Sequence, residues 1–205
     1  METLTQSLIE WAVATRTLQG QTVSGDRWLA LPTPDGFLAA VVDGLGHGER
    51  AAAAAMAGVA TLADHAGESV LHMMQRCHEN LRQTRGAAIS IAFFHAGERS
   101  LSWLGVGNVE GVLVRADPLA NPRCETLLLR GGVVGAWLPP LHGSILHVAR
   151  DDTLILVTDG IRRGFAPALA AGVSAQRIAD QTLEQYSTNA DDSLVLVARF
   201  RGIAP

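Results

Sequence analysis

The most informative part of this sequence is FLAAVVDGLGHG, residues 37–48. Its six leading apolar residues predict a buried strand, and Asp43 stands at the end of that strand. An Asp-Gly step between apolar runs usually indicates a hairpin turn. Here a glycine-rich loop follows instead, and then the alanine-rich run 49–63, which favours a helix because alanine is the best helix former. The stretch therefore predicts a strand that ends in a carboxylate, followed by a loop and a helix.

The flanking sequence predicts further strands and helices. The apolar run 28–31 and the turn PTPDG, residues 32–36, precede the first stretch and predict a hairpin with it. Residues 8–14 fit a strand, and a helix is also compatible with them. Apolar side chains at helical spacing predict a helix over 68–85. Later strands are expected at 88–94, 101–105, 109–115, 126–129, 145–148, 153–158 and 194–200, and a helix at 175–186 after the capping residue Ser174.

The order of these elements is strands, two helices, many strands, one helix and one strand. It does not alternate as βαβ units would, so it predicts an α+β fold of antiparallel sheets with helices packed outside them. The chain has 205 residues, of which 48% are hydrophobic and 18% charged. This size and composition suit one globular domain spanning 1–205, without a linker or internal repeat.

Charge and hydropathy exclude several classes of protein. The net charge is −4 and no basic run occurs, which argues against binding to nucleic acid. No signal peptide and no apolar run long enough for a membrane span are evident, so a cytoplasmic protein is expected. Cys77 and Cys124 lack CxxC spacing and are expected to be buried thiols in a reducing compartment, although a disulfide stays open.

Aspartates stand where apolar strands begin or end: Asp26, Asp43, Asp159 and the pair at 191–192. Burying an unpaired carboxylate is costly, and carboxylates brought together raise one another's pKa. Few basic residues flank these positions, so a hard divalent cation with oxygen ligands is the natural partner. Each aspartate alone also fits a solvated turn. The set, in this order, indicates a metal site.

Four motifs resemble those of the SpoIIE/PP2C family of metal-dependent phosphatases. They are SGD at 24–26, DGLGHG at 43–48, TDG at 158–160 and DDS at 191–193. The compact length and GVGNVE at 105–110 are most similar to the RsbX-type branch of stressosome serine phosphatases. The resemblance implies a four-layer α-β-β-α sandwich in which two antiparallel sheets are flanked by helices.

The resemblance also implies a site with two Mn²⁺ or Mg²⁺ ions. In that site Asp43 would bridge both ions and the Gly44 carbonyl would bind one of them. Asp159 and Asp191 would complete the other, and Asp26 would act near the ions as a metal-site and catalytic residue through bound water. Two cations lower the pKa of a shared water and offset charge on phosphoryl oxygens, so no serine or cysteine nucleophile is required.

Some residues depart from the family pattern. Better-known members carry a histidine two positions after the bridging aspartate, where this sequence has Leu45. His47, four positions after it, is either a catalytic proton donor to the leaving serine or a simple loop residue. The arginine that clamps phosphate in larger members has Arg16 and Arg27 as candidates here, unless both are surface residues. The role of Asp192 stays open.

The resemblance implies hydrolysis of phosphoserine or phosphothreonine on a signalling partner. The expected partner is a phosphorylated STAS-domain protein of a stressosome or a sigma-factor module, and dephosphorylation would reset the stress response. The enzyme would act as a monomer in the cytoplasm. Two alternatives stay open: a catalytically inactive module that binds a phosphoprotein, and a hydrolase of small phosphate esters.

Overall fold

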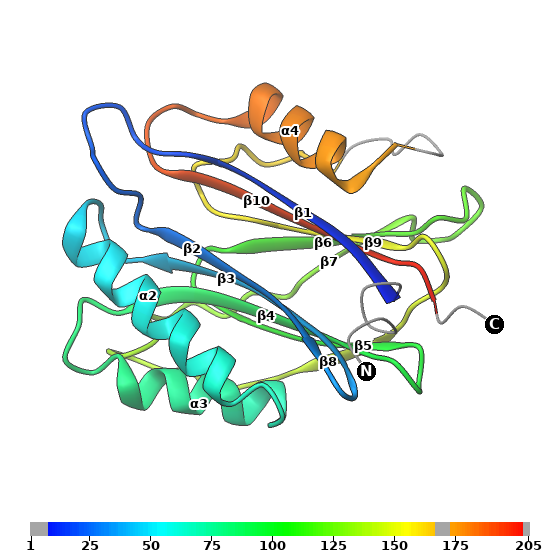
Figure 1. Ribbon diagram of the computed structural model, residues 1–205, viewed down its shortest axis with the longest axis horizontal. Coiled ribbons are helices and arrows are strands. Elements are labelled where there is room, and N and C mark those ends of the chain that lie inside the picture. The colour runs from blue at the N-terminus through cyan, green and yellow to red at the C-terminus, as the bar shows by residue number, and fades with distance from the viewer. Residues whose placement is uncertain (1–7, 167–172, 203–205) are drawn as a thin grey trace.

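Two five-stranded antiparallel sheets, stacked face to face, form the centre of the protein (Figure 1). The computed structural model describes residues 8–166 and 173–202. The first sheet has the order β1 (Ile9–Arg16), β10 (Ser193–Phe200), β9 (Thr153–Val157), β6 (Glu110–Val114) and β7 (Cys124–Thr126). The second has the order β2 (Asp26–Thr33), β3 (Gly36–Gly44), β4 (Ala87–His95), β5 (Ser100–Val106) and β8 (Ser144–His147).

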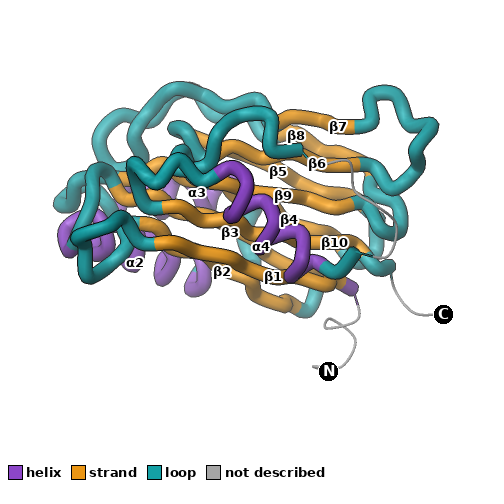
Figure 2. Tube along the Cα trace, turned by 90° about the horizontal axis from the view of Figure 1, so that it is seen from above, coloured by secondary structure: helices purple, strands orange, loops and turns teal. Residues whose placement is uncertain are grey.

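Helices cover the outer face of each sheet. Helices α2 (Glu49–Asp64) and α3 (Val70–Asn80) pack on the second sheet, and α4 (Ala175–Tyr186) packs on β1 and β10 of the first. Figure 2, seen from above, shows the helices on opposite sides of the stacked sheets. This arrangement confirms the predicted α-β-β-α sandwich. No helix within the described part of the chain is long and apolar enough to cross a bilayer.

The central strands are apolar on both faces because each face is covered. Successive side chains of a strand point to opposite sides of its sheet. In β10, Leu196 belongs to the core between the sheets, whereas Val195 belongs to the core beneath α4. In β3, Val41 faces the other sheet and Val42 faces α2 and α3. Continuous apolar runs such as 37–42 and 194–198 thus reflect two-sided burial.

Three predictions about local structure need correction. The helix expected over 68–85 spans only Val70–Asn80, because Ser69 caps its start. A turn follows its end, in which the Thr84 hydroxyl donates to the Leu81 carbonyl. The strand expected at 126–129 lies at Cys124–Thr126, where it pairs with the end of β6. Both cysteines are free, but Cys124 is exposed on this edge strand and only Cys77 is buried.

Candidate metal centre

Asp26 and Asp43 face each other at the open end of the predicted hairpin. They are register partners on β2 and β3, and the hairpin turn lies at the far end of the same strands. The Cα atoms of such opposed residues are about 4.5–5.5 Å apart. Asp26 is only 5% exposed and Asp43 is half-buried. One sheet thus places two carboxylates side by side at its edge.

The first sheet brings its own carboxylates to the same place. Asp159 follows the end of β9, and Asp191 precedes the start of β10, which is the antiparallel neighbour of β9. The Thr158 backbone N–H donates to the Leu194 carbonyl at 3.2 Å, which joins these two strand ends. The Thr158 hydroxyl donates to Oδ2 of Asp26 at 2.8 Å, so the two sheets meet at their carboxylate-bearing ends.

Burial and mutual repulsion set the electrostatics of this cluster. Burial raises the pKa of Asp43 to about 8, and the charge of Asp26 and the aspartates of the first sheet adds to that rise. Burial also raises the pKa of Asp26 to about 7, against the opposing effect of the Thr158 hydroxyl. Burial and the Asp191 carboxylate raise the pKa of Asp159. Without cations, the cluster therefore holds protons that ordinary aspartates would have lost.

The donor set fits hard divalent cations. Among the described residues, no arginine or histidine forms an ion pair with Asp26, Asp43, Asp159 or Asp191. Those residues also contain no group of three or more His, Cys, Asp and Glu side chains gathered tightly enough to enclose a single ion. The arrangement therefore suits ions that each take one or two of these carboxylates and keep several waters, as Mg²⁺ does.

Asp192 has a different role from its neighbour Asp191. Its Oδ2 accepts the Gly25 backbone N–H at 2.7 Å, and its Oδ1 accepts the Leu18 N–H at 2.8 Å. The side chain is almost fully buried. Asp192 thus ties the loop between β1 and β2 to the start of β10, and it positions the residue just before Asp26.

The two Asp-Gly steps are sites of close approach. A Cβ atom added at Gly44 would lie 2.0 Å from the Ala51 carbonyl oxygen at the start of α2. A Cβ atom at Gly160 would lie 2.0 Å from the Asp192 carbonyl oxygen. Neither contact leaves room for a side chain. The glycines therefore let the carboxylate-bearing loops pack directly on the opposing backbone.

The remaining sequence candidates lie around this cluster with no direct contact to its carboxylates. His47 is exposed in the loop before α2. Nη1 of Arg27 donates to the backbone carbonyls of Ser24 at 2.8 Å and Asp26 at 2.7 Å. Nη1 of Arg16 donates to Oδ1 of Asn189 at 2.8 Å on the surface. Neither arginine forms an ion pair with a carboxylate in the described part of the chain.

Two residues at the site were not singled out from the sequence. Nδ2 of Asn108 donates to Oδ2 of Asp159 at 2.6 Å, and this bond orients the carboxylate. The Arg85 guanidinium lies against the loop after Asp43, since a Cβ atom at Gly46 would come within 2.9 Å of its Nη1. Asn108 stands inside the quoted GVGNVE motif. Arg85 could have been found from strand register, because it precedes β4, whose Ala87 pairs with Gly44.

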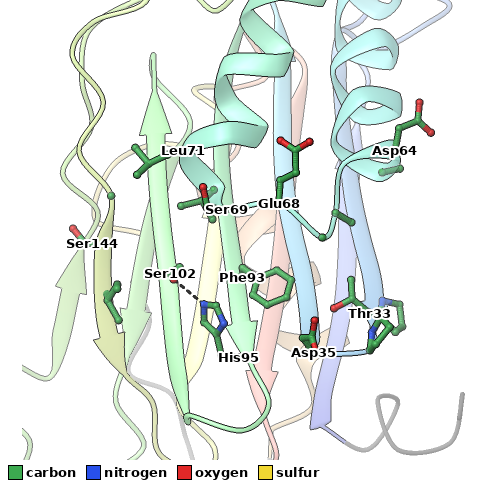
Figure 3. Close-up of a pocket in the computed structure, with 18 residues that line it drawn as sticks. Thr33, Asp35, Asp64, Glu68, Ser69, Leu71, Phe93, His95, Ser102 and Ser144 are labelled. Carbon is green, nitrogen blue, oxygen red and sulfur yellow. Dashed lines mark hydrogen bonds between the residues drawn. The ribbon is translucent and has the colours of Figure 1, made fainter.

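Cavity size does not locate this centre. A cavity of about 560 Å³ lies at the opposite end of the second sheet, by the turn between β2 and β3 (Figure 3). Its wall includes Phe93 and a hydrogen bond between Nε2 of His95 and Oγ of Ser102. A smaller cleft of about 440 Å³ borders Asp159 itself. Of the four clustered aspartates, Asp159 thus lines the smaller cleft, and none of them lines the larger cavity.

Solved structures share the whole architecture. A chain from a structure described as "The bacterial stressosome: a modular system that has been adapted to control secondary messenger signaling" has a TM-score of 0.86 and 27% identity, covering 93% of this chain and 99% of that chain. The crystal structure of RsbX in complex with magnesium has a TM-score of 0.84 and 23% identity, covering 94% and 96%. The fold is therefore that of the PP2C-like phosphatases.

Sequence comparison defines the family. The model of the family "Stage II sporulation protein E (SpoIIE)" matches residues 33–201. Phosphoserine phosphatase RsbX of Bacillus subtilis (strain 168) is 26% identical over 182 residues, which are 87% of this chain and 88% of that protein. The chain belongs to the SpoIIE family of PP2C-type metal-dependent serine/threonine phosphatases and is similar to RsbX.

Proposed function

We propose that this protein is a metal-dependent phosphatase that removes phosphate from phosphoserine or phosphothreonine on a protein partner. The observation that carries the proposal is the convergence of Asp26 and Asp43 from one sheet with Asp159 and Asp191 from the other. The pKa values of Asp26, Asp43 and Asp159 are raised, and the charge of Asp191 contributes to each rise. No basic side chain of the described residues forms an ion pair with any of these four carboxylates. A structural role alone would not assemble uncompensated carboxylates at a solvent-facing edge.

Two divalent cations, Mn²⁺ or Mg²⁺, would supply a deprotonated water and offset charge on the phosphoryl oxygens. Asp43, the Gly44 carbonyl, Asp159 and Asp191 would hold them. Asp26 would accept a hydrogen bond from a water in this site, because the Thr158 hydroxyl already fixes its other oxygen. Residues that orient such ligands are nearly as important as the ligands themselves.

The substrate phosphoryl group would approach from the side of the exposed loop before α2. Arg85 lies against that loop and has no carboxylate partner among the described residues. A guanidinium is well suited to hold phosphoryl oxygens in a forked geometry. His47, exposed in the same loop, would give a proton to the departing oxygen of the serine or threonine side chain, which leaves as a hydroxyl.

The similarity to RsbX and to the stressosome chain supports a substrate in stress signalling. The proposed partner is a phosphorylated STAS-domain protein, whose dephosphorylation would reset the response. We further propose that residues 1–205 act as one phosphatase domain, monomeric and in the cytoplasm.

The test compares the wild type with Asp43→Asn across a manganese titration, on p-nitrophenyl phosphate and on a phosphorylated STAS-domain protein. Turnover by Asp43→Asn should fall at least about 100-fold, because even residues behind the ligands cost 10- to 100-fold. Calorimetry should show weakened manganese binding. Asp180→Asn, which changes an exposed aspartate on α4, is the matched control and should behave as wild type.

The result also separates the alternatives. Wild-type protein that binds manganese but hydrolyses neither substrate would be an inactive phosphoprotein-binding module. Rapid turnover of small esters without any preference for the phosphoprotein would indicate a small-ester hydrolase. Equal activity of wild type and Asp43→Asn would contradict the proposed metal site.

A further inference from the structure

The cleft beside Asp159 carries basic side chains that the proposed chemistry does not use. It has a volume of about 440 Å³, and Asn108, Asp159, Arg162 and Arg163 line it. Its apolar wall includes Ile161, a buried residue next to Arg162 in the chain. A recess of this size accommodates side chains of a bound peptide. The cleft is continuous with the candidate metal centre because Asp159 belongs to both.

Arg162 is held in place at the rim. Its backbone N–H donates to the Tyr186 carbonyl at 2.8 Å, and its Nη2 donates to the Gln185 carbonyl at 2.6 Å. Both acceptors lie at the end of α4, so the side chain is anchored to a helix. A guanidinium has five N–H donors. Within the described part of the chain the side chain uses one of these donors, so the others are available to a ligand.

Arg163 is held only weakly. Its side chain is 91% exposed, and its Nε donates to Oε1 of Glu110 at 3.0 Å. An ion pair this exposed contributes about 0–1 kcal/mol, so an incoming carboxylate can replace Glu110 at little cost. The pair also keeps the arginine close to the cleft when no ligand is bound.

We propose that Arg162 and Arg163 form a subsite for an acidic side chain of the substrate protein, next to its phosphorylated residue. The inference rests on the proposed phosphatase function and adds a substrate class to it. The two guanidinium groups provide bidentate partners for an aspartate or glutamate carboxylate. Arg162 and Arg163 follow Asp159 by only three and four residues in the sequence. Sequences with acidic residues beside the phosphoserine are then preferred over neutral or basic ones.

The experiment uses manganese-loaded full-length protein and synthetic phosphoserine peptides. In these peptides a single aspartate is placed in turn at each nearby position on either side of the phosphoserine in an otherwise alanine background. A lysine series and the plain alanine peptide are the references. At least one aspartate position should lower KM about 5-fold relative to alanine while kcat stays the same, as expected for binding that is equal in ground and transition states. The lysine peptide at that position should bind more weakly than alanine.

Arg163→Glu should abolish the aspartate preference and reverse it toward lysine, and Arg163→Ala should abolish it without reversal. Arg177→Glu, an exposed arginine on α4 outside the cleft, makes the same change in net charge and should leave the preference intact. Raising the salt concentration should weaken the preference in the wild type, since exposed charges are screened.

The small substrate p-nitrophenyl phosphate separates the two proposals. If the wild type hydrolyses neither this small substrate nor any of the peptides, the phosphatase function itself is wrong. If the wild type hydrolyses it and the peptides but shows no charge preference at any position, or if Arg163→Glu retains the wild-type preference, the acidic subsite is refuted and the phosphatase function stands.

Discussion

The hydroxyl of Thr158 donates a 2.8 Å hydrogen bond to Oδ2 of Asp26, and this bond connects the end of β9 in one sheet to the start of β2 in the other. The same hydroxyl oxygen accepts the Leu194 backbone N–H at 2.9 Å. All three groups are buried. Thr158 therefore fixes a carboxylate, a strand end and the relative position of the sheets at one point.

Thr158→Val should destabilise the fold by about 1–3 kcal/mol, because it leaves a buried N–H and a buried carboxylate without their partner. It should also weaken manganese binding about 10- to 100-fold through loss of the orientation of Asp26. Chemical denaturation and calorimetry measure the two effects. Thr158→Ser keeps the hydroxyl and should stay close to wild type; if serine and valine behaved alike, the hydrogen bond would not be the cause.

The metal-free protein should lose stability as pH rises. The pKa of Asp26 is about 7 and that of Asp43 about 8 in the folded state, well above the value of about 3.9 for an unfolded aspartate. Between these values the folded state binds more protons than the unfolded state, so the free energy of unfolding falls as pH rises. The stability is complete below about pH 4 and is lost as pH passes through 7 and 8.

In EDTA, the Tm should therefore drop by roughly 5 °C or more between pH 5 and pH 9. Asp43→Asn should flatten the profile and raise the Tm at high pH, because it removes one of the repelling charges. Added Mn²⁺ should restore wild-type stability at high pH by replacing the lost protons. A wild-type profile that is flat, or one that rises with pH, would contradict the raised pKa values.

Asp191 and Asp192 should respond differently to the same substitution. Asp192→Asn weakens the bonds to Gly25 and Leu18 and should cost about 1–3 kcal/mol in stability with or without metal. Asp191→Asn should leave the metal-free protein as stable as wild type or more so, because it removes a repelling charge, and should weaken metal binding. Thermal melts with and without Mn²⁺ distinguish the two. The assignment is wrong if the two variants exchange these behaviours.

Arg85→Ala should raise KM for p-nitrophenyl phosphate roughly 10-fold and leave Mn²⁺ affinity unchanged, as expected for loss of a charge-assisted bond to phosphate. Arg82→Ala removes a nearby exposed arginine and is the control. Steady-state kinetics at saturating manganese measure the effect. Equal KM values for both variants would exclude Arg85 from substrate binding.

Much of the fold could be predicted because its apolar runs are long and its turns are marked. The hairpin predicted over 28–42 is confirmed. The predicted cap of α4 is confirmed as well, since Oγ of Ser174 accepts the Arg177 N–H. Short edge strands are harder to predict from the sequence. The strand predicted at 126–129 is displaced from β7, because only three residues pair there and their partners lie on another strand. The same limit applied to Cys124, whose exposure follows from its place on that edge.

The aspartates could be singled out because a carboxylate at the end of an apolar strand is costly unless it has a partner. Their separate roles could not. Asp191 and Asp192 are adjacent and chemically identical in the sequence. Only the fold shows that Asp192 accepts N–H groups from the distant loop between β1 and β2, whereas Asp191 accepts the N–H of its own neighbour. Asn108 and Arg85 likewise become site residues through strand pairing, which joins segments far apart in the chain.

The position of β10 has a consequence for the synthesis of the protein. This strand lies between β1 and β9. Its Phe200 pairs with Ile9 of β1, and its Val195 pairs with Val157 of β9. During translation, β1 must wait for a neighbour that is synthesised long after it, and contacts of such long sequence separation form slowly. A partly made chain that stops before β10 consequently exposes the apolar flank of β9 and lacks the loop with Asp191, so the proposed metal site would be completed only once residues 191–200 had been synthesised.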